Sequence, residues 1–240
     1  MLVAKSQGRC TLWVRDKEKA LNIAARRENV RFLPGVSLPN TLRIEHDPAA
    51  ALSGASLVIM AVPMQHLETN WGVVGNVINP AATILSGIKG LNPVSGERVS
   101  EAIARLTDPT ITDRFAVLSG PNLAREIASG EPATAVIAAA QASLAQEIQA
   151  RLRTPEFRTY ASDDVIGVEL AGALKNVIAI GAGMADGLRF GNNAKSALMT
   201  RGLAEITRLG VAAGANVLTF GGLAGMGDLI ATCASSHSRN

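Results

Sequence analysis

A lysine stands inside one of the most apolar stretches of the sequence. Lys175 lies in the segment 172–181, GALKNVIAIG, whose apolar spacing predicts a helix. Burying an ammonium group is costly unless it is paired or functional, and burial lowers its pKa toward neutrality, where it can exchange a proton with a reacting oxygen. Glu169 lies six positions earlier, outside the spacing of a helical ion pair. Lys175 is therefore the strongest catalytic candidate; the alternative is a structural lysine whose ammonium group reaches water.

Two glycine-containing segments at predicted strand ends carry further polar groups. Lys89 is flanked by glycines in the segment 86–91, SGIKGL. It offers a positive charge and three donors to a phosphate or carbonyl oxygen. The segment 119–124, SGPNLA, turns a strand into a helix, where backbone N–H groups could face an anion. A glycine–proline turn is equally common as a simple change of chain direction.

The last part of the sequence holds a third polar group of residues. Asp228 and Thr232 are four positions apart, so they share one face of a predicted helix. Ser238, Arg239 and Asn240 follow, and the forked guanidinium of Arg239 suits a phosphate. The alternative is a capped helix followed by a polar tail.

Arg15 follows a predicted strand, in the sequence WVRD at 13–16. In a dinucleotide-binding fold the residue after the second strand meets the adenosine ribose, and an arginine there accommodates a 2′-phosphate. Arg15 therefore favours NADP over NAD, unless it belongs to a solvated turn. The segment 61–63, AVP, ends the most apolar strand, where a cofactor could lie against the backbone or where proline simply stops the strand.

Strand and helix patterns alternate up to about residue 160. Several predicted strands are apolar on consecutive residues, which is typical of strands buried on both faces of a mostly parallel sheet. The alternation predicts an α/β, Rossmann-like doubly wound sheet. The strands are expected at 10–14, 42–45, 57–62, 83–88, 115–119, 134–139 and 157–161, and the helices at 17–27, 66–78, 97–106, 123–128 and 143–152.

A helical period replaces this alternation after Ser162, Asp163 and Asp164, which are good helix N-caps. Helices are predicted at 165–184 and 195–213. We therefore predict a Rossmann-like nucleotide-binding domain over residues 1–161 and the start of an all-helical domain over residues 162–240.

Composition excludes several other classes of protein. The chain has 240 residues, of which 48% are hydrophobic, 18% charged and 3% aromatic, with a net charge of +3. The dispersed charges and rare aromatic residues argue against nucleic acid as a partner. Neither the two cysteines, Cys10 and Cys233, nor the three histidines show metal-ligand spacing. No apolar run reaches the length of about 18 residues that spans a bilayer, so no membrane insertion and a cytoplasmic location are expected.

The motifs together resemble bacterial NAD(P)-dependent glycerol-3-phosphate dehydrogenase. The segment 164–170, DVIGVEL, leading into 172–181 is highly specific, and MTRGLAE at 199–205 is similar to the family's Ile-Thr-Arg-Gly-Leu-Ala-Glu. The resemblance runs along nearly the whole chain, through 31–35, 118–124, 163–187, 192–210, 223–233 and 238–240.

The resemblance implies reversible hydride transfer between NADH or NADPH and dihydroxyacetone phosphate, giving sn-glycerol 3-phosphate for glycerophospholipid synthesis. Lys175 matches the family's proton donor and acceptor, and Lys89 matches a lysine that contacts both cofactor and substrate. The other implied substrate positions are Gly120, Asn122, Asp228, Ser238, Arg239 and Asn240, and the other cofactor positions are Arg15, Ala124 and Arg239. The family usually has Ser or Thr where this sequence has Asn122, whose amide can still donate a hydrogen bond.

The sequence departs from the family at both ends. The family's first strand and its GxGxxG turn are absent, and the chain stops just after the Arg-Asn pair. We therefore expect both domains to be incomplete and the pyrophosphate site to lack donors. Two alternatives stay open: an inactive truncated remnant, and a related hydroxyacid or ketoacid reductase, which would lack the cluster from Asp228 to Asn240. The oligomeric state also stays open, and a homodimer is one alternative.

Overall fold

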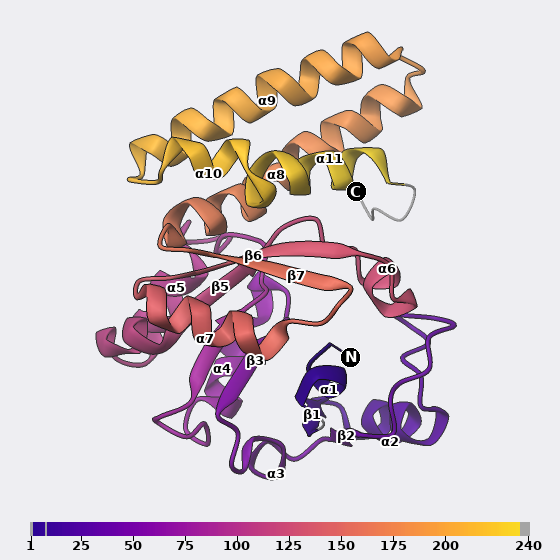
Figure 1. Ribbon diagram of the computed structural model, residues 1–240, viewed down its shortest axis with the longest axis vertical. Coiled ribbons are helices and arrows are strands. Elements are labelled where there is room, and N and C mark those ends of the chain that lie inside the picture. The colour runs from indigo at the N-terminus through magenta and orange to yellow at the C-terminus, as the bar shows by residue number, and fades with distance from the viewer. Residues whose placement is uncertain (1, 8, 236–240) are drawn as a thin grey trace.

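The computed structural model describes residues 2–7 and 9–235, with an α/β part followed by a helical part (Figure 1). Each strand expected from the sequence is present, and the α/β fold class is confirmed. The strands are β1 (Cys10–Trp13), β2 (Leu42–Glu45), β3 (Leu57–Met60), β4 (Thr83–Ser86), β5 (Phe115–Ser119), β6 (Ala133–Ala139) and β7 (Phe157–Ser162).

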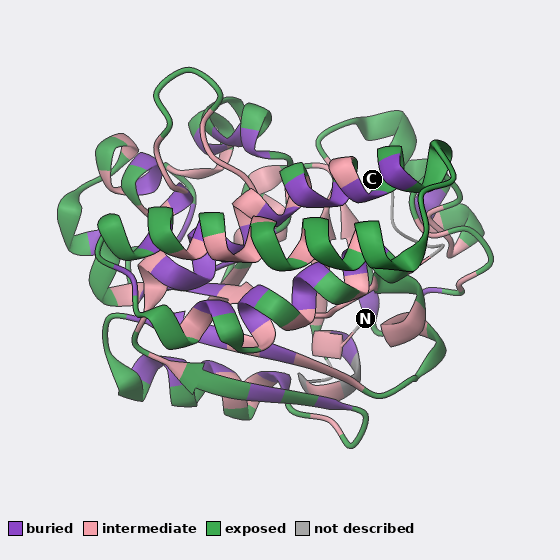
Figure 2. Ribbon diagram, turned by 90° about the horizontal axis from the view of Figure 1, so that it is seen from above, coloured by how far each residue is buried: buried purple, intermediate pink, exposed green. Residues whose placement is uncertain are grey.

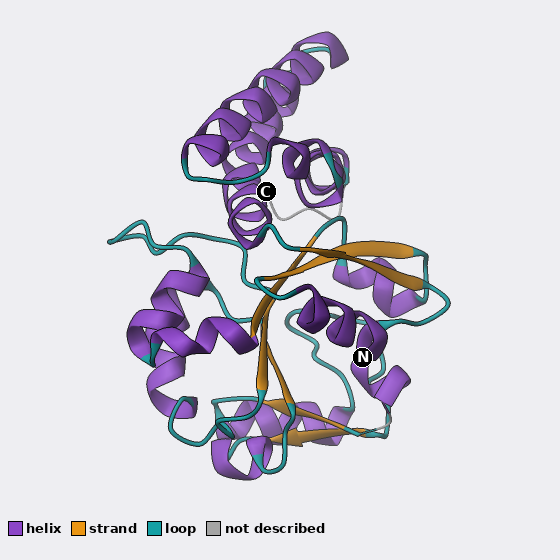
Figure 3. Ribbon diagram, turned by 60° about the vertical axis from the view of Figure 1, so that its left-hand side comes forward, coloured by secondary structure: helices purple, strands orange, loops and turns teal. Residues whose placement is uncertain are grey.

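The strands form two sheets. β1 and β2 pair in parallel, and the other strands form a five-stranded sheet in the order β3-β4-β5-β6-β7 (Figure 3). All neighbours in the larger sheet are parallel except β5 and β6, which run antiparallel with Ser119 opposite Val136. The connection between these two strands contains one short helix, and antiparallel neighbours need no long crossover. The mostly parallel sheet is thus confirmed, with one antiparallel pair.

Helices cover both faces of the larger sheet. Ile84 and Leu85 are adjacent in β4 and both buried, but they belong to different apolar clusters on opposite faces. Helices α4 and α5 pack on one face and α7 on the other, which explains why the strands are apolar on consecutive residues. The helices of this part are α1 (Leu2–Gln7), α2 (Lys17–Arg26), α3 (Pro48–Leu52), α4 (Leu67–Val74), α5 (Val99–Leu106), α6 (Ala124–Ser129) and α7 (Ala142–Leu152).

The helical part begins directly after β7. The Asp164 carboxylate caps α8 by accepting a hydrogen bond from the Gly167 N–H at 2.8 Å, as the acidic cap predicted. α8 packs along α9, and Figure 2 shows long exposed faces on the outer helices. The proposed boundary at residue 161 stays a prediction. The elements are α8 (Val165–Gly187), α9 (Asn192–Ala212), α10 (Val217–Gly221), the π-helical turn η3 (Leu223–Gly227) and α11 (Asp228–Ala234).

α8 corrects one expectation from the sequence. The sequence predicts no apolar run long enough to span a membrane. By length and composition alone, α8 is nevertheless long and apolar enough to do so. However, 56% of its most apolar window is buried inside the protein. Glu169 and Lys175 lie along it as buried, hydrogen-bonded side chains, which is the environment of a core helix.

Candidate active site

Three segments that are distant in the sequence meet beside α8. Lys89 follows β4, and Ser119 ends β5, so both stand at the carboxyl edge of the parallel strands where ligands bind in open α/β sheets. Lys175 projects from α8, and Asp228 begins α11. The structure thus brings together five of the residues predicted from the sequence, namely Lys89, Gly120, Asn122, Lys175 and Asp228.

Asp228 joins the two lysines. Its Oδ1 accepts a hydrogen bond from the Lys175 ammonium group, and its Oδ2 accepts one from Lys89 Nζ at 2.7 Å. The Asp228 side chain is only 4% exposed. With both lysines protonated, two ammonium groups and one carboxylate leave a net positive charge, which favours an anionic ligand.

Lys175 is the more deeply buried lysine. Its ammonium group also donates to Thr232 Oγ1 at 2.6 Å, and Thr232 in turn donates to the Asp228 carbonyl at 2.7 Å, one turn earlier in α11. Burial is the largest cause that lowers the pKa of Lys175 to about 8, and the nearby charge of Lys89 adds to it, while Asp228 opposes both. The side chain can therefore gain or lose a proton close to neutral pH.

Lys89 has a more open environment than Lys175. Its Nζ donates to the Gly120 carbonyl at 3.2 Å and to Asn122 Oδ1 at 3.1 Å, in addition to Asp228. Its side chain is 21% exposed, compared with 6% for Lys175. Lys89 is thus the lysine that a ligand entering from solvent can reach first.

Two glycines allow these segments to approach closely. A Cβ at Gly172 of α8 would lie 2.8 Å from Ser119 Oγ and 3.6 Å from Lys89 Cγ. Gly120 has a φ of +142° and leaves no room for a side chain, because a Cβ would lie 2.9 Å from the Ala135 Cα. Without Gly172 α8 could not pack at its present distance from β5, and without Gly120 the chain after β5 could not lie so close to β6.

The remaining predicted residues lie elsewhere. Arg15 is exposed directly after β1, and Ala124 is exposed at the start of α6. Among the residues that the structure describes, no hydrogen bond or ion pair joins Arg15 to Lys89 or Lys175. Ser238, Arg239 and Asn240 lie outside the described residues. Within the part of the chain that the structure describes, no group of His, Cys, Asp and Glu side chains could hold a metal ion.

Sequence reasoning did not assign a site role to Ser119 or Thr232. Ser119 Oγ lies 3.5 Å from Asp228 Oδ2, and Thr232 contacts Lys175 directly. The signal for Thr232 was present in its four-residue spacing from Asp228. Ser119 had only its place at a predicted strand end.

Comparisons with known proteins give a consistent result. Residues 1–145 match the family described as NAD-dependent glycerol-3-phosphate dehydrogenase N-terminus, and residues 164–240 match the corresponding C-terminus. The glycerol-3-phosphate dehydrogenase [NAD(P)+] of Streptomyces avermitilis is 48% identical over 240 residues, covering 100% of this chain and 71% of that protein. The enzyme of the same name from Dehalococcoides mccartyi is 47% identical over 230 residues, covering 95% of this chain and 64% of that protein.

Solved structures agree with these relatives. Glycerol-3-phosphate dehydrogenase from Coxiella burnetii is 34% identical with a TM-score of 0.92, covering 99% of this chain and 72% of that chain. A ketopantoate reductase from Ralstonia eutropha is 17% identical with a TM-score of 0.62, covering 90% of this chain and 70% of that chain, and shares the fold alone.

Proposed function

Because this chain belongs to the NAD-dependent glycerol-3-phosphate dehydrogenase family, we propose that Lys175 is its proton donor and acceptor. The reaction is the reversible reduction of dihydroxyacetone phosphate to sn-glycerol 3-phosphate with NADH or NADPH. Its product is the glycerol phosphate unit of glycerophospholipids.

The single observation that carries this role is the buried Lys175–Asp228 pair. When bound, the nicotinamide cofactor supplies the hydride. The Lys175 ammonium group gives a proton to the carbonyl oxygen that becomes the alcohol, and in the reverse direction the neutral amine accepts that proton. A pKa of about 8 suits both directions, because both protonation states are populated near neutral pH.

Lys89 is proposed to bind the substrate, since its ammonium group is the more exposed of the two. Asp228 orients both ammonium groups through its two oxygens. The excess positive charge attracts the phosphate ester and the oxygen on which negative charge develops. Gly120, Asn122, Ser238, Arg239 and Asn240 are proposed as further substrate contacts, of which Arg239 suits the phosphate best.

The chemistry of Arg15 and Lys89 fits two parts of a nicotinamide dinucleotide. Arg15 presents an exposed guanidinium group at the carboxyl end of the parallel strand β1, where a ribose phosphate would bind. Lys89 follows the carboxyl end of β4, and its side chain is partly exposed to solvent. We propose that Arg15, Lys89, Ala124 and Arg239 contact the cofactor and that Arg15 favours NADPH.

Location and assembly are also proposals. The small-molecule substrate and the burial of α8 support a cytoplasmic enzyme without membrane insertion. The exposed apolar side chains of the helical part, such as Met184 and Leu218, are compatible with a homodimer.

The test is the Lys175→Ala variant, assayed by NADPH oxidation with dihydroxyacetone phosphate. We expect kcat to fall by about 10²–10⁴-fold, the usual loss for a general acid, with nearly unchanged cofactor binding. Lys195→Ala is the matched control, because Lys195 forms an ion pair with the exposed Asp186. Near-normal turnover of Lys175→Ala would exclude the role. An unsubstituted chain without turnover would favour the inactive remnant, and turnover of ketoacids alone would favour the related reductase.

A further inference from the structure

A second buried charge lies on the helix that carries Lys175. Glu169 is 5% exposed and accepts three hydrogen bonds. They come from Arg98 Nη1 at 2.8 Å, the Ser100 N–H at 2.8 Å and Ser100 Oγ at 2.6 Å. Every donor belongs to the beginning of α5, so Glu169 ties α5 to α8.

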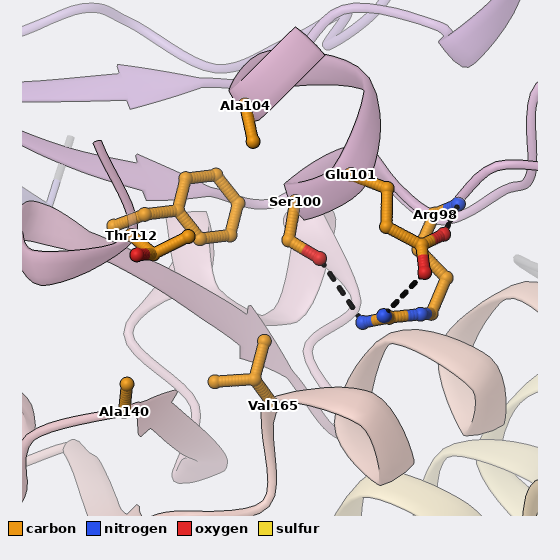
Figure 4. A pocket seen from close by; sticks show the side chains of 8 residues that line it. Arg98, Ser100, Glu101, Ala104, Thr112, Ala140 and Val165 are labelled. Carbon is orange, nitrogen blue, oxygen red and sulfur yellow. Dashed lines mark hydrogen bonds and ion pairs between the residues drawn. The ribbon is translucent and has the colours of Figure 1, made fainter. Parts of the chain in front are cut away.

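Arg98 is held on its other side as well. Its Nη2 donates to Glu101 Oε1 at 2.6 Å, and its Nη1 donates to Ser100 Oγ at 3.0 Å (Figure 4). Figure 4 shows these side chains at one end of an apolar pocket that Val165 also lines. The guanidinium group therefore lies between an exposed carboxylate on α5 and a buried one on α8.

The segment before α5 leads directly back to the active site. Lys89 and Arg98 are the two ends of one loop, which is closed by a hydrogen bond from the Asn92 N–H to the Glu97 carbonyl at 2.9 Å. Arg105 Nε, on α5, donates a hydrogen bond to Glu97 Oε1 at 2.9 Å, and this contact fixes the loop to α5. Movement of the start of α5 would therefore be transmitted to Lys89.

On α8, the residue that contacts α5 and the catalytic lysine are also close together. Glu169 and Lys175 are six residues apart, about 9 Å along the helix at about 1.5 Å per residue. Gly172 lies between them and packs against Ser119 and Lys89. The same two segments, the loop 89–98 and α8, are thus joined at one end by the contact of Glu169 and carry Lys89 and Lys175 at the other.

We propose that Glu169 is a positioning residue, which sets the separation of Lys89 and Lys175 by holding the loop 89–98 against α8. This inference rests on the proposed function for its catalytic consequence, but its geometric content does not. A buried ion pair is weak evidence for added stability, and fixing the register of two elements is a better attested use.

The experiment compares Glu169→Gln with Glu101→Gln, its matched control. Both substitutions remove a carboxylate that pairs with Arg98, but Glu101 lies on the solvent side, 48% exposed. The first readout is the pKa of Lys175, measured by NMR of lysine labelled with ¹⁵N at Nζ, without substrate or cofactor. We expect Glu169→Gln to raise this pKa from about 8 toward its ordinary value of 10.5, because Lys89, whose charge lowers it, moves away with the loop while Asp228 stays beside Lys175.

The second readout is turnover. Glu169→Gln should lower kcat by up to about 10²-fold with a much smaller change in the KM for the cofactor, and Glu101→Gln should leave both unchanged. Ser100→Ala keeps the charge pair and decides the question if Glu169→Gln does not fold; we expect a smaller change in the same direction. An unchanged Lys175 pKa in a folded Glu169 or Ser100 variant would overturn the inference. A shifted pKa in a chain without turnover would refute the proposed function alone.

Discussion

Replacing Asp228 by asparagine tests the electrostatics of the site most directly. The variant keeps the size of the side chain but removes the charge that faces Lys175 and Lys89. Asp228 is the group that raises the pKa of Lys175 against burial and the charge of Lys89. An opposite charge at this range is worth about 1–3 pH units, so the pKa of Lys175 should fall from about 8 to roughly 5–7.

The consequence for turnover follows from the protonated fraction. At pH 8 about half of Lys175 is protonated in the natural chain, and less than about a tenth would be protonated in Asp228→Asn. Reduction needs the protonated form, so kcat should fall by at least about fivefold at pH 8 and recover as the pH is lowered.

The assay is the pH profile of kcat for reduction of dihydroxyacetone phosphate, from about pH 5 to pH 9. Asp186→Asn is the control, since it removes the exposed carboxylate that pairs with Lys195. Its profile should match that of the natural chain. If Asp228→Asn loses activity equally at every pH, the carboxylate only orients the lysines, and our electrostatic explanation is wrong.

Three further predictions concern stability and cofactor choice. Burial lowers the pKa of Lys175 from 10.5 to about 8, so the unfolded chain binds more protons between these values, and the free energy of unfolding should rise with pH by about 3 kcal/mol relative to Lys175→Met. Urea unfolding of both proteins at several pH values checks this, and parallel curves would contradict it. Gly172→Ala should lower the free energy of unfolding by about 1–3 kcal/mol, because its Cβ would lie 2.8 Å from Ser119 Oγ; an unchanged urea midpoint would show that α8 can shift freely. Arg15→Gln should raise the KM for NADPH by about 10–100-fold, the value of one charged hydrogen bond, and leave that for NADH nearly unchanged; equal effects on both would remove the 2′-phosphate role.

The strands could be predicted because the sheet has two covered faces. Ile84 and Leu85 are both buried, so the sequence shows a continuous apolar run rather than alternation. The direction of β6 was not predictable in this way, because hydrophobic pattern does not record whether neighbouring strands run parallel. The short helix α3, Pro48–Leu52, has too few residues to show a helical period.

The site was only partly predictable for a different reason. A lysine in an apolar helix indicates that some partner exists, but Asp228 is 53 positions from Lys175 and 139 from Lys89. Such contacts depend on tertiary packing, and spacing rules cover only neighbours within a helix or strand. The family resemblance therefore had to place Lys89, Lys175 and Asp228 in one site. Nothing in the sequence indicates the contact of Glu169 with Arg98.

The distance between Lys175 and Asp228 along the chain has a consequence during synthesis. At about 5–20 residues per second, the ribosome adds the intervening 53 residues in about 3–10 s. Throughout that interval α8 lacks its carboxylate partner and the packing that α11 provides, although α9 is added before the interval ends. The nascent helix then presents an apolar surface with an unpaired ammonium group at its centre, which is a surface that chaperones recognise. The helix that carries Asp228 thus completes both the lysine site and the apolar packing of the core helix.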